Sequence, residues 1–183
     1  SVLCGCWAQI DEEAAKALGA DIVYGSGDRE KLVEEIARSL ESREKVVRID
    51  EPFKRRQMEV LPAGAFSGHA RAYLKIEDGC ANFCSYCIIP YARGRVRSLP
   101  PEEAAAQAAE LASRGYRELV VTGIEIASYG TDLPGKPDLA DVVRAVAEAA
   151  PALRIRLGSL EPTVVTEDFC RALAETGRVC PHF

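Results

Sequence analysis

The sequence predicts an α/β fold with parallel strands, and three observations carry this prediction. Short apolar segments typical of strands alternate with segments in which apolar residues recur at helical spacing. The connections between them are short, as in parallel β-α-β units. Glycines and polar residues follow several of the strand-like segments, at the sheet edge where α/β proteins place functional groups. With 183 residues, 48% of them hydrophobic, the chain is long enough to bury a core.

The first part of the chain has the order of half a small doubly wound domain. The expected elements are a strand end and turn at 2–7, a helix at 11–18, a strand at 20–24, and a helix that carries Leu32, Ile36 and Leu40. Charges, prolines and glycines then predict a linker over residues 42–68. The basic run Lys54–Arg56 is expected to be a solvated part of this linker, with contact to nucleic acid as the alternative.

The second part of the chain continues the alternation. The expected elements are strands at 70–76, 118–122 and 153–157, helices at 98–115, 139–149 and 167–175, and a further strand from Val179. The first three strands lead into a cysteine-rich segment, into 122–125 (TGIE) and into 158–161 (GSLE). Because parallel strands end at the same edge of a sheet, we expect these three segments on one rim.

Composition narrows the class of protein. A net charge of −5 argues against a surface covered in nucleic-acid-binding charge. No apolar run approaches the length of a membrane span and no signal peptide is visible, so we expect a cytoplasmic protein without a membrane partner. The seven cysteines are clustered, which favours metal or redox chemistry over a disulfide framework. The chain opens without Met on a strand-like segment, and we expect an internal fragment of a longer protein.

Three of the cysteines form a C-x3-C-x2-C triplet at Cys80, Cys84 and Cys87. Structural zinc sites and ferredoxin clusters normally use four protein ligands. A triplet on one short loop therefore suggests an iron–sulfur cluster with one coordination position open to another molecule. The alternative is a structural zinc site that takes His69 as its fourth ligand. Of the other cysteines, Cys170 is expected in the core and Cys180 is expected to be structural.

Several stretches resemble one known family. The residues CANFCSYC resemble the signature of the radical S-adenosylmethionine (SAM) superfamily, and residues 71–98, RAYLKIEDGCANFCSYCIIPYARGRVRS, resemble its methylthiotransferase family. Residues 5–9, GCWAQ, resemble an element of that family's N-terminal domain. The stretches VTGIEIASYG and IRLGSLEP resemble the branch that modifies N6-threonylcarbamoyladenosine in tRNA.

The resemblance implies a fold and a set of cofactors. The fold would be the first strands of a partial (β/α) radical SAM barrel at 66–183, preceded at 1–65 by half of the N-terminal domain with its linker. Cys80, Cys84 and Cys87 would hold a [4Fe-4S] cluster whose fourth iron is chelated by SAM. Cys6 would be a ligand of a second, auxiliary [4Fe-4S] cluster, whose other cysteines lie upstream of this chain. The alternative for Cys6 is a buried small apolar residue.

The resemblance also implies a reaction. A methylthio group would replace hydrogen at C2 of threonylcarbamoyladenosine at position 37 of tRNA, with the cofactors supplying the radical chemistry. The partners would be the tRNA anticodon loop, an electron donor and a sulfur source. The present fragment alone is expected to be inactive. Two alternatives stay open: the same chemistry on isopentenyladenosine in tRNA or on an Asp of a ribosomal protein, and a non-catalytic metal-binding or electron-transfer module.

Further candidate residues lie around the proposed cofactors. Those expected near SAM or the substrate are Tyr86, Gly123, Glu125, Ser159 and Glu161. Gly123 would let the backbone approach SAM because it has no side chain; ordinary loop packing or strand-end turns are the alternatives for these positions. Arg93, Arg95 and Arg97 alternate, so an extended segment would place them on one side for phosphate contact, with a solvated or internally paired rim as the alternative.

Overall fold

The structure is a computed structural model, and it describes residues 1–60 and 70–182. The described chain divides into two compact units, each of which is treated by itself. The first contains Ser1–Glu59 and Cys80–Arg95, and the second contains Val60–Gly79 and Val96–Phe183 apart from the undescribed residues. The predicted domain boundary at 65/66 and the alternative zinc ligand His69 lie outside the described residues.

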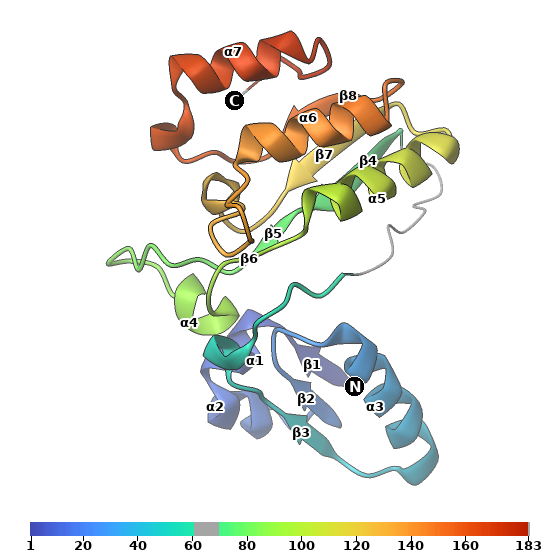
Figure 1. The fold of residues 1–183 in the computed structure, drawn as a ribbon. Helices are drawn as coiled ribbons and strands as arrows, with labels where there is room; N and C mark the ends of the chain where they lie inside the picture. Colours follow the sequence, from blue (N-terminus) through green and yellow to red (C-terminus); the bar gives the residue numbers. More distant parts are fainter. Residues whose placement is uncertain (61–69, 183) are drawn as a thin grey trace. The chain divides into compact units, whose positions relative to one another are not determined.

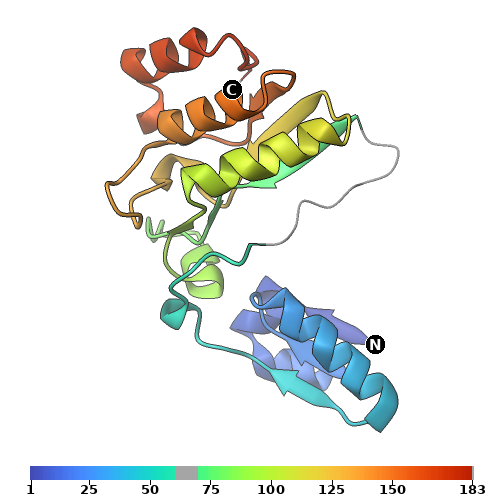
Figure 2. The ribbon, with the colours of Figure 1, turned by 45° about the vertical axis from the view of Figure 1, so that its right-hand side comes forward.

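The first unit is built on a three-stranded parallel sheet in the order β1-β2-β3. Its strands are β1 (Val2–Cys4), β2 (Ile22–Tyr24) and β3 (Val46–Arg48). Helix α3 (Arg29–Ser42) lies on one side of the sheet, and α1 (Cys6–Ile10) and α2 (Glu12–Ala17) lie on the other (Figures 1 and 2). A small apolar core forms around the buried residues Ala8, Ala15 and Val23.

Three predictions for this unit are wrong. Cys6 and Trp7 are not in a turn but begin α1, and the linker predicted at 42–68 contains β3 and a 3-10 turn, η1 (Pro52–Lys54). Strand β3 is an edge strand with two exposed residues, so its sequence lacks the buried apolar pattern. Arg55 of the basic run is not solvated, because its guanidinium pairs with Asp50 and its Nη1 donates to Ser26 Oγ at 2.9 Å.

The cysteine segment joins the first unit through α4 (Ile89–Arg93) and the residues beside it. Ser26 Oγ donates to the carbonyl of Ala92 at 2.6 Å. Gly94, at the end of α4, has φ +81° and lies against the backbone of η1, where a Cβ would come within 2.2 Å of the Pro52 carbonyl oxygen. Only glycine fits this backbone conformation and spacing without a shift of the chain.

The second unit is an open parallel sheet in the order β4-β7-β8, which confirms the predicted fold class. The strands are β4 (Arg71–Lys75), β7 (Glu118–Thr122) and β8 (Arg154–Leu157), and β5 (Glu77–Asp78) pairs antiparallel with β6 (Arg97–Ser98). Helices α5 (Pro101–Ser113) and α6 (Leu139–Ala149) run side by side over one face of the sheet, and α7 (Glu167–Glu175) packs against α6 (Figure 1). Two short 3-10 turns, η2 (Ile126–Ser128) and η3 (Pro162–Val164), follow β7 and β8.

Local sequence accounts for the helices of this unit. Asp138 and Asp141 form a capping box at the start of α6, and the valines predicted to face inward, Val142, Val143 and Val146, are fully buried. In α7, Phe169 and Leu173 are buried, whereas Cys170 is exposed, so its predicted place in the core is wrong. Cys180 is buried, and the strand expected from Val179 is reduced to a single parallel bridge with Ile155. Among the described residues, no helix has the length and apolar character required to cross a membrane.

Candidate cofactor site

The carboxyl ends of the three parallel strands lie side by side, as predicted for the segments after β7 and β8. The cysteine-rich segment Cys80–Arg95 belongs to the other compact unit, so its expected place on this rim stays a prediction. The Ile76 amide, just after β4, donates to the Thr122 carbonyl at the end of β7 at 2.9 Å. The Gly158 amide, just after β8, donates to the Val121 carbonyl at 2.8 Å. These bonds place the residues that follow β4, β7 and β8 on one rim of the sheet, where α/β proteins bind ligands.

Glu77 is the most unusual group on this rim. Its side chain is fully buried, and its Oε2 accepts hydrogen bonds from the amides of Ile124 at 2.8 Å and Glu125 at 2.7 Å. Its other oxygen, Oε1, is the one buried side-chain polar atom without a hydrogen-bond partner in the described part of the chain. Burial raises the pKa of Glu77 to about 7, although the two amides favour its charged form.

Gly123 makes room for Glu77. A Cβ built on Gly123 would come within 2.8 Å of Glu77 Oε2 and of Ile126 Cγ2, and within 2.9 Å of the Glu77 carbonyl oxygen. The missing side chain at this position therefore has a structural reason inside the protein, and the role predicted for it toward SAM stays a prediction.

The other predicted rim residues take part in local turns. The Glu125 carboxylate accepts from the Ala127 amide at 3.1 Å and caps η2, and the Glu161 carboxylate accepts from the Thr163 amide at 3.0 Å and caps η3. Ser159 is exposed. Glu125 and Glu161 thus occupy equivalent places after neighbouring strands.

Asp78, next to Glu77, lies in a buried charged group. Its Oδ2 is 2.7 Å from Lys75 Nζ and 3.4 Å from Arg97 Nη2, and the side chain of Arg97 is only 4% exposed. Arg97 lies in β6, whereas Arg93 ends helix α4 and Arg95 is exposed between the two elements. The prediction that these three arginines share one side of an extended segment is therefore wrong.

The cysteine triplet lies on a loop of the first unit that is closed at its base. The Cys80 amide donates to the Gly94 carbonyl at 3.0 Å, and the Cys87 amide donates to the Cys84 carbonyl at 2.9 Å. Cys80 is buried, Cys84 is exposed and Cys87 is half-buried, and none of the three is in a disulfide. Within residues 1–60 and 70–182, the structure does not bring three Cys, His, Asp or Glu side chains together as a metal-binding group. Three cysteine thiols on one short loop are nevertheless the donor set that a [4Fe-4S] cluster with three protein ligands requires.

An aromatic cluster supports this loop. Phe83, between Cys80 and Cys84, stacks on Phe53 of η1 with ring centroids 6.2 Å apart, and both rings meet Tyr91 of α4 edge to face. Phe83 adopts a positive φ of 47°, which is uncommon for a bulky residue. Tyr86 of the same loop is 91% exposed.

Two predicted residues that are distant in sequence meet in the first unit. Arg93 Nε donates to Cys6 Sγ at 3.2 Å, and Arg93 Nη1 donates to the Ser26 carbonyl at 3.4 Å. Cys6 is half-buried at the start of α1. The contact links the segment that resembles the family's N-terminal domain to the helix that follows the cysteine triplet.

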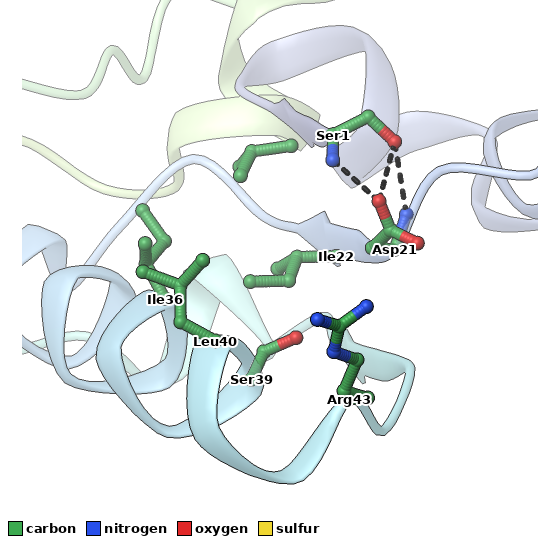
Figure 3. A pocket seen from close by; sticks show the side chains of 8 residues that line it. Ser1, Asp21, Ile22, Ile36, Ser39, Leu40 and Arg43 are labelled. Carbon is green, nitrogen blue, oxygen red and sulfur yellow. Dashed lines mark hydrogen bonds and ion pairs between the residues drawn. The ribbon is translucent and has the colours of Figure 1, made fainter.

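A separate cavity in the first unit involves other residues. It has a volume of about 380 Å³ and lies between the starts of β1 and β2 and the helix α3, with Ile36, Ser39, Leu40 and Arg43 on the helix side (Figure 3). Among the residues that line it, Ser1 Oγ donates to Asp21 Oδ2 at 2.9 Å (Figure 3). No predicted site residue lines this cavity.

Two residues of the site, Glu77 and Asp78, were not predicted from the sequence. Glu77 and Asp78 precede the first cysteine of the triplet as a pair of acids before a glycine, a pattern that is also typical of a solvated turn. The available signal was their position, since they directly follow a predicted buried strand at its functional end.

Comparison with known proteins agrees with the resemblance. Residues 74–183 match the family model described as the radical SAM superfamily. The chain is 37% identical, over 99% of its length, to "Threonylcarbamoyladenosine tRNA methylthiotransferase MtaB" of Bacillus subtilis. It is 36% identical, over 97% of its length, to "tRNA-2-methylthio-N(6)-dimethylallyladenosine synthase" of Syntrophomonas wolfei, and 37% identical, over its whole length, to "Ribosomal protein uS12 methylthiotransferase RimO" of Gloeobacter violaceus.

These three relatives are longer than the chain, which spans 41%, 40% and 42% of them, respectively. Their names describe three different substrates, although the three relatives are nearly equal in their identity to the chain. What they share is the class of chemistry, and the match over residues 74–183 covers more than half of the chain. The chain belongs to the radical SAM superfamily and, within it, to the methylthiotransferase family.

Proposed function

We propose that the full-length protein is a tRNA-modifying methylthiotransferase that adds a methylthio group to C2 of N6-threonylcarbamoyladenosine at position 37. The observation that carries the proposal is the loop with the thiols of Cys80, Cys84 and Cys87, within the residues matched by the radical SAM superfamily. Its partners are the tRNA anticodon loop, an electron donor and a sulfur source.

The three thiols of the loop would hold a [4Fe-4S] cluster. When bound together with SAM, this cluster supplies the one-electron chemistry that activates an unactivated C–H bond. The chain's part is to bind and orient. The loop keeps its base closed through the Cys80–Gly94 backbone bond, and the rim after β7 and β8 offers polar groups at Glu125, Ser159 and Glu161 for SAM or the substrate.

Three residues of the first unit have further proposed roles. Cys6 is a ligand of the auxiliary cluster, Tyr86 contacts the adenine of SAM, and Arg95 is exposed for phosphate contact. We also propose that residues 1–65 belong to the family's N-terminal domain and residues 66–183 to the radical SAM core. The fragment on its own, at about two fifths of the length of its relatives, is proposed to be inactive.

The choice of substrate rests on two stretches and one relative. VTGIEIASYG and IRLGSLEP resemble the threonylcarbamoyladenosine branch, and the Bacillus subtilis relative carries that activity in its name. The Syntrophomonas and Gloeobacter relatives carry other substrates at comparable identity, so the experiment must compare all three products.

Mass spectrometry of tRNA nucleosides and of ribosomal protein uS12, from cells lacking the gene, tests the proposal. We expect loss of the methylthio form of threonylcarbamoyladenosine, with the isopentenyladenosine product and uS12 unchanged. The full-length gene should restore the product, Cys84→Ala should not, and Cys170→Ala, which removes an exposed thiol of α7, should restore it as well as the unaltered gene. Loss of either other product, with threonylcarbamoyladenosine modification intact, would overturn the substrate assignment.

A further inference from the structure

Glu77 is placed where it controls the shape of the turn after β7. One oxygen of its carboxylate receives two consecutive backbone amides, those of Ile124 and Glu125, at 2.8 and 2.7 Å. Two converging amides on one oxygen fix the orientation of both peptide planes. The turn that carries Glu125, which the proposed function assigns to SAM or the substrate, is therefore held by a side chain of a different strand, β5.

Burying the carboxyl group of Glu77 in this way costs free energy of folding. A fully buried carboxyl group loses its hydration, and Oε1 recovers no hydrogen bond from the described residues. The neighbouring charges do not offset this cost, because Asp78 disfavours the charged form and Lys75, which favours it only weakly, is paired with Asp78. A group retained at such a cost at a strand end is a candidate for a functional role.

Gly123 is adapted to the same contact. Its Cα faces Glu77 so closely that a Cβ would lie 2.8 Å from Oε2 and 2.9 Å from the Glu77 carbonyl oxygen. The glycine and the acid therefore form a matched pair, since the turn can close over Glu77 only where the first turn residue has no side chain.

We propose that Glu77 is a positioning residue that presets the Gly123–Glu125 turn for the amino-acid part of SAM by holding the amides of Ile124 and Glu125. The proposal rests on the proposed function, which places Glu125 of this turn among the groups that meet SAM or the substrate. Glu77 acts through the turn and does not itself touch the cofactor.

Three substitutions separate positioning from simple folding. Glu77→Gln keeps a carbonyl oxygen that accepts from both amides, whereas Glu77→Leu removes the acceptor at similar volume. Glu77→Asp keeps the carboxylate but shortens the side chain by one methylene group, which moves the acceptor away from the two amides. This variant replaces Glu77→Leu if the leucine variant does not fold. Glu118→Gln is the matched control, because Glu118 is a buried carboxylate at the opposite end of β7, paired there with Arg71, Arg154 and Arg156.

Two measurements on the full-length protein are needed. Hydrogen exchange at the amides of Ile124 and Glu125, followed without SAM by mass spectrometry with peptide fragmentation, reports the contact itself. Equilibrium dialysis of the reconstituted holoenzyme with labelled SAM reports its consequence. For Glu77→Leu or Glu77→Asp we expect about tenfold faster exchange and about tenfold weaker SAM binding, which is the scale of one lost charge-assisted hydrogen bond. Glu77→Gln and Glu118→Gln should stay within about threefold of the unaltered protein in both measurements.

The outcomes are distinguishable. Unchanged exchange in Glu77→Leu and Glu77→Asp would refute the contact. Faster exchange with unchanged SAM affinity would refute the positioning role. An equal loss of SAM affinity in Glu118→Gln would show that the effect comes from general destabilisation of the protein, and it would also refute the positioning role. Failure of the unaltered holoenzyme to bind SAM would refute the proposed function and the cofactor part of this proposal, while the exchange rates would still decide whether Glu77 holds the turn.

Discussion

Arg93 donates a hydrogen bond from Nε to the sulfur of Cys6 at 3.2 Å, although 87 positions separate the two residues in the chain. The same guanidinium donates from Nη1 to the carbonyl of Ser26 at 3.4 Å. One arginine therefore ties the end of α4, just beyond the cysteine triplet, to the start of α1 and to the turn after β2. Arg93 was a candidate for RNA contact, but both of these hydrogen bonds join it to other residues of the first unit.

Arg93→Ala should lower the free energy of unfolding by about 1–2 kcal/mol, because it leaves the Ser26 carbonyl and the Cys6 sulfur without this donor. Urea unfolding, followed by circular dichroism, measures the change. Arg56→Ala, at an exposed position of the same unit, serves as the control and should change stability by less than about 0.5 kcal/mol. Equal losses in the two variants would contradict the tie.

Gly123→Ala should be destabilising by about 1–3 kcal/mol, because the added methyl group would overlap Glu77 Oε2 and Ile126 Cγ2. Gly158→Ala at the neighbouring strand end is the comparison, since a Cβ there would meet its nearest neighbours at 3.3 Å and requires only a slight adjustment. Thermal unfolding of the two variants should rank Gly158→Ala as the more stable. The reverse ranking would show that Glu77 does not occupy the space beside Gly123.

Glu77 should make stability depend on pH in a direction opposite to that of most carboxylates. Burial raises its pKa from an ordinary value near 4.5 to about 7, so the folded protein holds a proton that the unfolded chain has released. This contribution is fully present below pH 4.5 and is lost as the pH rises through 7, with a total on the order of 3 kcal/mol.

The measurement compares Glu77→Gln with the unaltered protein. Urea unfolding at pH 5 and pH 8 should show that the glutamine variant gains stability relative to the unaltered protein at the higher pH, since it cannot ionise. The other carboxylates titrate in both proteins and cancel in the comparison. A difference between the two proteins that is the same at both pH values would contradict the raised pKa.

Phe83→Ala should loosen the cysteine loop, because Phe83 connects it to Phe53 and Tyr91. We expect faster hydrogen exchange over residues 80–88 and a loss of about 1 kcal/mol in stability, the scale of an aromatic contact between partly exposed rings. Tyr86→Ala, which removes a ring that is 91% exposed in the same loop, should change neither quantity. Identical exchange in both variants would show that the aromatic cluster does not support the loop.

The elements predicted best from sequence are those with strong local signals. Helices α6 and α7 and strand β7 begin and end at the predicted residues, because caps such as Asp138 and buried positions such as Val142 and Leu119 lie within the elements themselves. Strand β3 was missed because an edge strand of three residues between charged segments has little apolar pattern of its own.

The parts of the site that could be predicted are those whose residues lie close together in the sequence or follow from the order of the strands. The triplet at Cys80, Cys84 and Cys87 is visible in eight consecutive residues, and the shared rim follows from the parallel order of the strands. Two other contacts depend on tertiary packing between segments that are distant in the sequence, for which no local pattern exists. They are the hydrogen bond from Arg93 to Cys6 and the hydrogen bond from the Ile124 amide to the buried Glu77.

The central claim is that Cys80, Cys84 and Cys87 hold a [4Fe-4S] cluster with an open position for SAM. Electron paramagnetic resonance of the full-length protein, reconstituted and reduced under anaerobic conditions, tests it most directly when spectra are recorded with and without SAM. We predict a cluster signal whose shape changes on addition of SAM and is lost when any one of the three cysteines is replaced by Ser, but not in Cys170→Ser. Bound zinc in place of iron, or a cluster signal that survives the three substitutions and ignores SAM, would contradict the claim.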